Sequence, residues 1–527
     1  METGYDSGIM QYSAILSKLH AIDREHRRLE RISALLQWDQ ETFLPPEGVA
    51  ERAEQLALIE GIAHRCLTAP ETGKLLADAG STAGSPRGDE SLQAADRDFL
   101  RVMRRKYDRA ARLPPDFVSK SARAEGLSQA AWAEARMKKD FSIFLPHLST
   151  MIDTARQKAK YFKEGIGEKA SLYDCLLDIY EPGMGEAEIG PLFASLRGRL
   201  SPLLRRIQNS APPDTSFLKQ PFPAERQAAF NRKLLDCLGF DHRWGRLDIS
   251  AHPFTTTLGP DDVRITTRYF EDNALSGLFS VIHETGHAMY EMGFPPELRA
   301  EDSCLADGAS MAVHESQSRF WENVIGRSLP FWECLFPLLR EYFPVQLADV
   351  TADQFYRAVN EVKPSFIRVD ADEVSYGLHI IFRFELEQRL ISGDLDPARI
   401  PQAWHEKTKE YLGLDNEALG ISSGELALQD IHWSMGSFGY FPSYLLGNLY
   451  GSQFSRKMNG DIPNFAGLAA GGKFGMIREW LRDNVYRWGC RLEPSELLQK
   501  VTGEKLQAEP FMDYIENKYS GIYSLIR

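Results

Sequence analysis

His283 and His287 stand four residues apart in a segment with helical periodicity, and Glu284 directly follows the first histidine. Residues i and i+4 lie on one face of an α-helix, so both imidazoles can bind the same metal ion. Glu284 then lies beside that metal, where it can accept a proton from a metal-bound water. The segment is therefore predicted to be a helix, and its H-E-x-x-H pattern is typical of zinc-dependent peptide hydrolysis.

The ends of this helix are also marked in the sequence. Asp272 or Asn273 can cap its N-terminus, and Gly293, followed by two prolines, ends it. The apolar residues between them recur at helical spacing: Leu275, Leu278, Phe279, Ile282, Gly286 and Met289. The alternative to a metal site is a buried helix with two hydrogen-bonded histidines, and a third ligand is needed to decide between them.

Glu315 is the expected third ligand. A catalytic zinc usually has three protein ligands and one open position. Residues 309–322 again show helical spacing, and Glu315 lies 28 residues after His287, which suits an antiparallel return to the first helix. His314 is the alternative ligand, or else a partner that orients one. Two carboxylates of the connecting loop are weaker candidates, namely Glu301 and Asp302.

Further motifs follow in the order found in one peptidase family. They are R-x-D-x-x-x-H-P-F at 246–254, D-x-R-x-T at 262–266, H-E-S-Q-S at 314–318, I-R-x-x-A-D at 367–372 and Q-D-x-H-W at 429–433, preceded by L-L-Q-W-D-Q at 35–40 and P-P-E-G at 45–48. Over nearly its whole length the chain resembles the thermostable carboxypeptidase Taq group of zinc metallocarboxypeptidases. One motif departs: Leu426 stands where that family has Gly, and its side chain is expected to reshape a pocket wall without removing a catalytic group.

The resemblance implies a zinc-dependent metallocarboxypeptidase that releases single amino acids from peptide C-termini with broad specificity. His283, His287 and Glu315 would hold one zinc per chain, with cobalt as a substitute. Glu284 would be the general base for the zinc-activated water that attacks the scissile carbonyl. The family also implies a mainly α fold with a deep substrate cleft, and a homodimer.

Donors for the tetrahedral oxyanion are sought among the polar aromatic residues near Gly436 and Gly439. His432 and Tyr440 are the catalytic candidates, and Tyr444 is a further substrate-binding candidate. For each, the alternative is a buried ring whose polar atom is satisfied within the core.

A carboxypeptidase also needs a cation for the terminal carboxylate of its substrate, best supplied by an arginine. Arg368 is the leading candidate because the family's I-R-x-x-A-D motif is associated with substrate binding; the alternative is an ion pair with Asp370 or Asp372. Arg264 is the second choice. Three further residues are expected near the site: Gln429 on the substrate backbone, Asp262 orienting a zinc-bound imidazole, and His252 beside the site or stabilising its loop.

Composition excludes several classes of protein. The net charge of −13 argues against a nucleic-acid-binding protein. Six scattered cysteines without a C-x-x-C pair indicate a reducing compartment, and the N-terminus lacks the features of a signal peptide, so a cytoplasmic location is expected. Residues 431–455 carry no Asp, Glu, Lys or Arg but are too polar for a membrane span. We expect 436–444 to be an ordered loop lining a pocket.

The expected fold class is mainly α, with a small antiparallel β-hairpin or sheet beside the zinc helix. Two β-branched runs around a turn predict that hairpin at 253–269, and its edge can pair with an extended peptide. Residues 1–527 are expected to form one unit, with two helical lobes around a cleft as an alternative and the zinc-site motifs within 246–445. Helices are predicted at 10–34, 47–66, 92–109, 115–138, 143–165, 185–209, 223–238, 330–343, 352–363, 373–392 and 476–488.

Two other functions compete with this hypothesis. A zinc endo-oligopeptidase or dipeptidase would use the same site without a fixed cation closing one end of the cleft. A catalytically silent scaffold or binding protein would keep the fold alone. Glu284 argues against the scaffold, because a silent site has no need of a general base.

Overall fold

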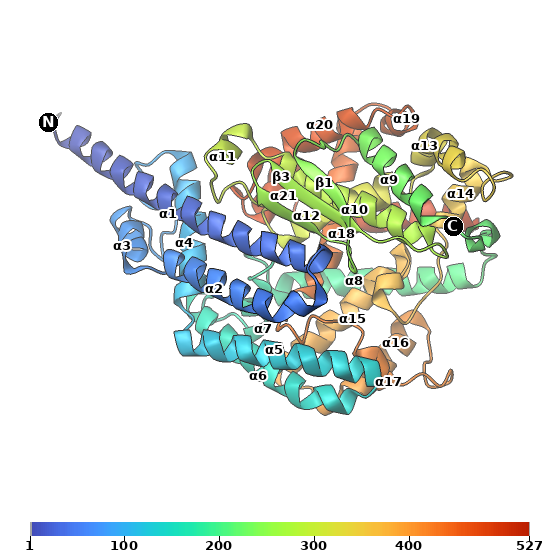
Figure 1. The fold of residues 1–527 in the computed structure, drawn as a ribbon, viewed down its shortest axis with the longest axis horizontal. Coiled ribbons are helices and arrows are strands. Elements are labelled where there is room, and N and C mark those ends of the chain that lie inside the picture. The colour runs from blue at the N-terminus through green and yellow to red at the C-terminus, as the bar shows by residue number, and fades with distance from the viewer. Residues whose placement is uncertain (1–2, 526–527) are drawn as a thin grey trace.

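The computed structural model describes residues 3–525, and only the backbone of residues 3–11. Its helices and one small sheet are shown in Figure 1. The first half contains α1 (Thr3–Thr42), α2 (Val49–Leu67), α3 (Pro70–Asp78), α4 (Ala94–Ala111), α5 (Pro115–Lys138), α6 (Phe141–Ile166), α7 (Leu172–Leu177), α8 (Glu186–Gln208), α9 (Ala224–Leu238), β1 (Gly245–Ile249), β2 (Thr255–Gly259) and β3 (Asp262–Thr267).

The second half is helical. It contains α10 (Ala274–Met292), α11 (Pro296–Ala300), α12 (Met311–Arg319), a π-helical turn (Phe320–Ile325), α13 (Leu329–Tyr342), α14 (Ala352–Val359), α15 (Glu373–Ser392), α16 (Ile400–Leu412), α17 (Ser423–Ala427), α18 (Phe441–Asp461), α19 (Phe465–Ala470), α20 (Phe474–Asn484), α21 (Pro494–Thr502) and α22 (Glu509–Tyr523). The mainly α fold class predicted from the sequence is confirmed.

The sheet differs in part from its prediction. β2 and β3 pair antiparallel, as the hairpin required, but β1 adds to the other side of β3 in parallel, giving the order β1-β3-β2. This third strand, which makes the sheet mixed, was not predicted. A short run such as 245–249 pairs with a strand distant in sequence, so its neighbours alone do not reveal it. β2 remains at an edge of the sheet.

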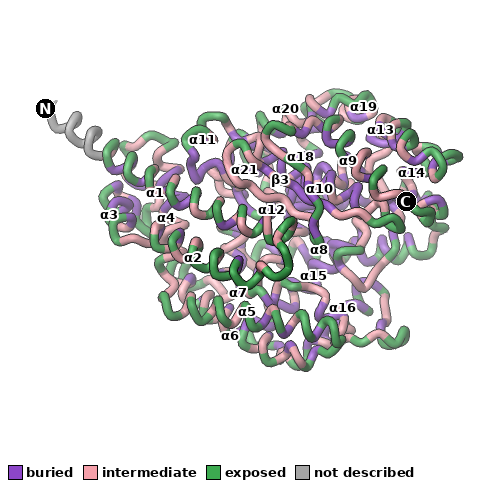
Figure 2. Tube along the Cα trace, in the orientation of Figure 1, coloured by how far each residue is buried: buried purple, intermediate pink, exposed green. Residues whose placement is uncertain are grey.

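The segment 431–455 is also corrected. The predicted loop at 436–444 ends at Tyr440, and α18 begins at Phe441 and continues to Asp461. Residues 441–455 of α18 are buried except for the half-buried Tyr444, and Figure 2 shows buried segments gathered towards the middle of the molecule, where α18 is labelled. A helix buried on every side needs no charged face, which explains the absence of charge that marked this stretch in the sequence. None of the described helices is long and apolar enough to cross a membrane.

Three helices that carry the site are packed unusually closely. α12 lies between α10 and α18. A Cβ added to Gly286 of α10 would lie 2.5 Å from the Gln317 carbonyl oxygen on α12. From the opposite side, a Cβ at Gly447 of α18 would lie 2.7 Å from Cγ of Glu315. Small residues at these positions let the backbones approach, and this fixes α12 from two sides.

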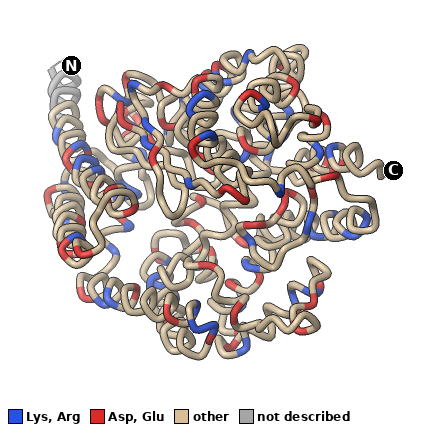
Figure 3. The backbone as a smooth tube through the Cα atoms, turned by 45° about the vertical axis from the view of Figure 1, so that its right-hand side comes forward, with Lys and Arg blue, Asp and Glu red and all other residues tan. Residues whose placement is uncertain are grey.

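The remaining helices surround this centre. α1 and α2 form a hairpin that reaches out on the left of Figure 1, and α5 and α6 pack against each other below it. One large cluster of buried apolar side chains includes residues from Ile15 to Tyr523, and a smaller one lies between the sheet, α9 and α10. Lys, Arg, Asp and Glu are interspersed along most elements rather than separated by sign (Figure 3).

Candidate metal centre

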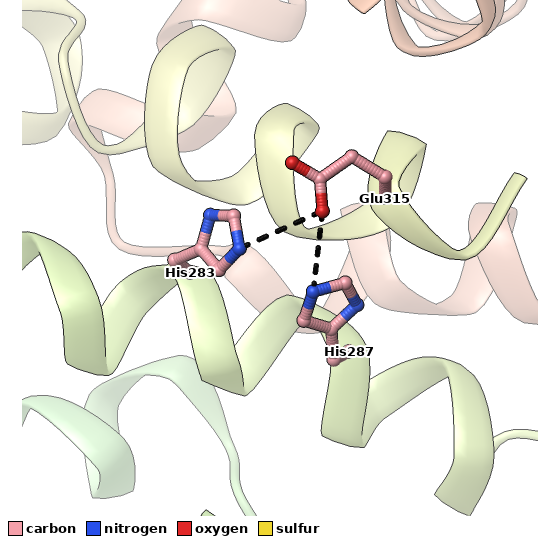
Figure 4. Close-up of side chains that lie close together, drawn as sticks. All are labelled: His283, His287 and Glu315. Atoms are coloured by element: carbon pink, nitrogen blue, oxygen red, sulfur yellow. Dashed lines mark ion pairs between the residues drawn. The ribbon is translucent and has the colours of Figure 1, made fainter. Parts of the chain in front are cut away.

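His283, His287 and Glu315 converge at one point (Figure 4). The two histidines lie one turn apart on α10, which begins with Asn273 as its cap, and Glu315 reaches them from α12. Glu315 Oε2 is 3.7 Å from His283 Nε2 and 3.5 Å from His287 Nε2. Two imidazole nitrogens and one carboxylate oxygen form the donor set of a catalytic zinc site with an open fourth position. The residues present therefore fit the metal that the sequence predicts.

Glu322 fixes the orientation of His283. Its Oε2 lies 2.9 Å from His283 Nδ1, so Nδ1 carries the proton and Nε2 keeps its lone pair towards Glu315. Arg319 and Arg327 also approach this carboxylate, at 3.4 Å and 3.3 Å. Burial would raise the pKa of Glu322, but the His283 hydrogen bond and the arginines lower it to about 2. Glu322 is therefore ionised and accepts from the imidazole.

His287 is oriented through a longer chain. Its Nδ1 lies 2.6 Å from His314 Nδ1, and His314 Nε2 lies 2.9 Å from Glu291, which also accepts from Thr257 at 2.9 Å. If His287 Nε2 is to bind a metal, its Nδ1–H must donate to His314, and His314 Nε2–H must donate to Glu291. Burial lowers the pKa of His287 to about 4, which keeps the ring neutral. The alternative role of His314, an orienting partner, is the one that this geometry supports.

Glu315 is held by the helix that carries it. Ser310 caps α12, and Arg319, one turn after Glu315, donates from Nε to Oε1 at 2.7 Å. This bond leaves Oε2 facing the histidines. Burial opposes ionisation of Glu315, but Arg319 and His283 lower its pKa well below the ordinary value.

Glu284 lies beside the three converging side chains and is 6% exposed. The Thr255 hydroxyl, at the start of β2, donates to Glu284 Oε2 at 2.6 Å. The edge strand thereby positions the carboxylate. Burial raises the pKa of Glu284, in the direction that suits a group that must accept and return a proton.

The predicted aromatic donors lie together near the same point. His432 Nε2 is 3.1 Å from the Tyr444 hydroxyl, and the rings of Tyr440 and Tyr444 are 5.2 Å apart. Burial, followed by the negative charge of Glu315, raises the pKa of Tyr440, so this phenol stays protonated. Tyr440 ends the loop and Tyr444 lies on the first turn of α18. This helix therefore connects the two tyrosines to Gly447, which contacts Glu315.

Arg368, the candidate for the substrate carboxylate, is buried and forms an ion pair, but not with the aspartates that the alternative interpretation named. Its Nε donates to Asp430 at 2.8 Å, rather than to Asp370 or Asp372. Arg383 donates to the other oxygen of Asp430 at 2.7 Å, so two guanidinium groups share one carboxylate and one positive charge is left over. Arg368 also lies 5.0 Å from the centre of the Tyr444 ring.

Gln429, predicted to bind the substrate backbone, has hydrogen-bond partners within the chain. Its oxygen accepts from the Arg368 backbone N–H at 2.8 Å, and its nitrogen donates to the Phe366 and Leu426 carbonyls at 3.0 Å and 2.9 Å. Both N–H groups and the oxygen of this amide therefore fix the segment that carries Arg368. Leu426 is itself 4% exposed and contributes to the core.

Three candidates from the sheet region have other contacts. Asp262 binds Arg264 at 2.9 Å and 2.8 Å, and Arg264 lies 4.3 Å from the centre of the Trp38 ring of α1. The prediction that Asp262 orients an imidazole is wrong, because Glu322 and His314 occupy those positions. His252 is exposed, and its backbone carbonyl accepts from Ser250 at 2.6 Å.

Sequence reasoning missed the carboxylates that orient the histidines, although their spacing contains a signal. Glu291 lies four residues after His287, on the same face of α10, and Glu322 lies seven residues after Glu315. Thr255 had no such signal, because it meets Glu284 only when the sheet packs on α10.

Comparison with known proteins decides the family. The model of the carboxypeptidase Taq (M32) metallopeptidase family matches residues 18–519. The chain belongs to this family. It is 42% identical over 520 residues to thermostable carboxypeptidase 1 of Thermus thermophilus, covering 98% of this chain and 100% of that protein. Carboxypeptidase 1 of Bacillus subtilis is 38% identical, with 96% and 100% covered.

The fold agrees with solved structures of the same family. The M32 carboxypeptidase of Deinococcus radiodurans superposes with a TM-score of 0.91 at 39% identity, covering 97% of this chain and 100% of that one. The Pyrococcus furiosus carboxypeptidase structure gives a TM-score of 0.90 at 36% identity, covering 96% and 99%. The family M32 chain described here is therefore a peptide hydrolase, a metallocarboxypeptidase.

Proposed function

We propose that this M32 enzyme is a zinc carboxypeptidase that removes single amino acids from peptide C-termini with broad specificity. The convergence of His283, His287 and Glu315 on one point, with Glu284 held beside them, carries the proposal. These three residues would hold the zinc, and cobalt is the expected substitute. When bound, zinc supplies a Lewis acid for the scissile carbonyl and lowers the pKa of water.

Glu284 acts as the general base. The Thr255 hydroxyl occupies its Oε2, so Oε1 remains to accept a proton from the attacking water and return it to the leaving amine. The carboxylate must not turn away while it carries that proton, and the bond to β2 restrains it. β2 is an edge strand of the sheet, and pairing of an extended peptide with it, as in β-strand addition elsewhere, is part of the proposal.

The aromatic group stabilises charge that develops on the substrate. Tyr440, Tyr444 and His432 are the donors proposed for the tetrahedral oxyanion. Burial and the charge of Arg368 lower the pKa of His432 to about 4, although Asp430 opposes this, so the ring acts as a neutral donor or acceptor. Arg368 is the proposed partner of the terminal carboxylate, because Asp430 neutralises only one of two arginines. Arg264 is less suited, since Asp262 already binds it through two bonds.

We further propose that residues 1–527 form one catalytic unit that works as a homodimer in the cytoplasm on peptide substrates, without nucleic acid or membrane partners. The large buried cluster running from α1 to α22 supports the single unit. The free cysteines support a reducing compartment, since no disulfide links any of the six.

Two peptides of the same sequence test the function. Both carry a blocked N-terminus; one has a free C-terminal carboxylate and the other an amide. The zinc-loaded enzyme is expected to trim only the first, one residue at a time, and the Glu284→Gln variant should bind zinc but trim neither. Internal cleavage of both peptides would instead identify an endo-oligopeptidase, and hydrolysis of free dipeptides alone a dipeptidase.

The carboxylate contact is tested by two matched arginine variants. Arg368→Ala should raise KM for the free carboxylate at least tenfold, because a charge-assisted bond is lost. Arg264→Ala should change KM little. The reverse result would move the assignment to Arg264.

A further inference from the structure

The loop that carries His432 and Tyr440 is fastened to a buried carboxylate outside the site. Glu387 lies on α15 and is fully buried. Its Oε1 accepts from Trp433 Nε1 at 2.9 Å, and its Oε2 accepts from the Gly439 backbone N–H at 3.0 Å. Trp433 directly follows His432, and Gly439 directly precedes Tyr440. One carboxylate therefore holds both ends of the segment 433–439.

Contacts with α7 further restrain the segment 433–439. Tyr173 of α7 donates a third hydrogen bond to Glu387, at 2.8 Å. Gly439 has φ +88°, and a Cβ there would lie 2.8 Å from the backbone of Leu176 on the same helix. The Gly439 backbone is thus pressed against α7 while its N–H is held by α15. Trp433 is also buried, at 5% exposure.

We infer that Glu387 is a positioning residue for peptide hydrolysis, which holds His432 and Tyr440 in register with the candidate metal centre by tying both ends of the 433–439 segment. The inference rests on the proposed roles of His432 and Tyr440. In the part of the chain that the structure describes, Glu387 forms no hydrogen bond or ion pair with either side chain or with the three metal candidates, so it acts only through the segment.

The chemistry of the site requires a carboxylate at this position. Three donors point at two oxygens, and above its raised pKa of about 7 the Glu387 carboxylate accepts on both without offering a proton. Glutamine has the same shape, but its amide must point an N–H at Trp433 or at Gly439. Glu387→Gln should therefore release one end of the segment while changing little of the packing.

A second buried carboxylate provides a matched control. Glu181 is also fully buried, and no ion pair reaches it from the described residues. It accepts from the Tyr450 hydroxyl at 2.9 Å and from the Ala312 N–H at 3.3 Å. It therefore holds the first turn of α12, which carries Glu315, rather than the segment 433–439. Glu181→Gln imposes the same chemical change on the metal side of the centre.

Amide hydrogen exchange followed by mass spectrometry tests the inference on the full-length enzyme. Glu387→Gln should speed exchange in peptides covering 433–440 at least tenfold and leave 310–316 unchanged, while Glu181→Gln should do the reverse. Zinc content of Glu387→Gln should equal that of the wild type, and its kcat should fall at least tenfold. Equal acceleration of both segments in both variants would show general loosening and overturn the inference.

His432→Ala and Tyr440→Phe distinguish a failure of the inference about Glu387 from a failure of the proposed roles of His432 and Tyr440. Suppose that both variants lower kcat, and that Glu387→Gln speeds exchange in 433–440 without lowering kcat. Glu387 then has no positioning role. If neither lowers kcat, the proposed roles of His432 and Tyr440 are wrong, and with them the catalytic meaning of the segment. In the His432→Ala, Tyr440→Phe background, Glu387→Gln is expected to change kcat less than twofold, because its effect passes through those two side chains.

Discussion

Gly286→Ala should separate the two helices that carry the metal candidates. Gly286 lies between Thr285 and His287, and its added Cβ would lie 2.5 Å from the Gln317 carbonyl oxygen and 2.6 Å from Ser318 Cα. Both are backbone atoms of α12, so no side chain can rotate away. Carbon contacts need about 3.5 Å, so α12 must retreat by roughly 1 Å, and Glu315 moves away from the two histidines with it.

The cost follows from overpacking. Inserting a methyl group into a closely packed core costs about 1–3 kcal/mol, whereas alanine in place of glycine within a helix contributes about 1 kcal/mol of stability. Gly198→Ala in α8 isolates that second contribution, since nothing lies within 4 Å of its added Cβ. We expect Gly198→Ala to be slightly stabilising, and the difference between the two variants to equal the cost of moving α12.

Zinc affinity is the decisive assay, measured by competition with a chromophoric chelator. Loss of a group that orients a metal ligand typically costs 10- to 100-fold in affinity. Displacing the ligand Glu315 itself should cost at least as much, so Gly286→Ala should bind zinc at least tenfold more weakly while Gly198→Ala keeps the wild-type value. Gly447→Ala, which presses on Glu315 from α18, should weaken binding in the same direction. Wild-type affinity in Gly286→Ala would refute the argument that close approach of α10 and α12 sets the ligand spacing.

Three further predictions follow from the same geometry. Glu322→Leu should weaken zinc binding 10- to 100-fold, because His283 loses its acceptor. Glu322→Gln should weaken zinc binding less, because its amide oxygen still accepts. Equal losses of affinity in the two variants would contradict the orienting role of Glu322. Chelation should lower Tm, and zinc at 100 times its Kd should raise the free energy of unfolding by about 2.7 kcal/mol. A Tm that does not change with zinc concentration would contradict a metal that binds only the folded chain. Burial, with a smaller contribution from Asp430, raises the pKa of Glu387 from 4.5 to about 7, so the folded protein binds this proton more tightly than the unfolded chain. The stability that this proton contributes is fully present below pH 4.5 and is lost as pH rises through 7. In urea denaturation, the free energy of unfolding of the wild type should fall by about 2–3 kcal/mol relative to Glu387→Gln between pH 5 and 8. A difference between the two proteins that does not change with pH would argue against the raised pKa.

The helices were predictable where a local pattern determines them. The predicted helices at 115–138 and 373–392 agree with α5 and α15 at both ends, and the ends of α10 follow its cap and its glycine. Each depends on residues within a few turns of one another. The spacing of His283 and His287 likewise predicts that they share one face of a helix, because helical geometry alone determines this. In the structure Glu315, on α12, converges with them. The sequence by itself therefore determined the mainly α class, the helix that carries His283 and His287, and the hairpin that follows the pattern of β-branched residues.

The tertiary structure decided everything that depends on distant partners. α18 could not be recognised from local pattern, because a helix buried on all sides has no polar face to set its period. β1 became a strand only by pairing with β3, and Arg368 took Asp430, 62 residues away, in place of the nearby aspartates. Thr255 met Glu284, and Glu387 met Trp433 and Gly439, by the packing of elements far apart in the chain. Hydrogen bonds depend on distance and angle in space, so the residues that hold the catalytic candidates in place were fixed by the fold.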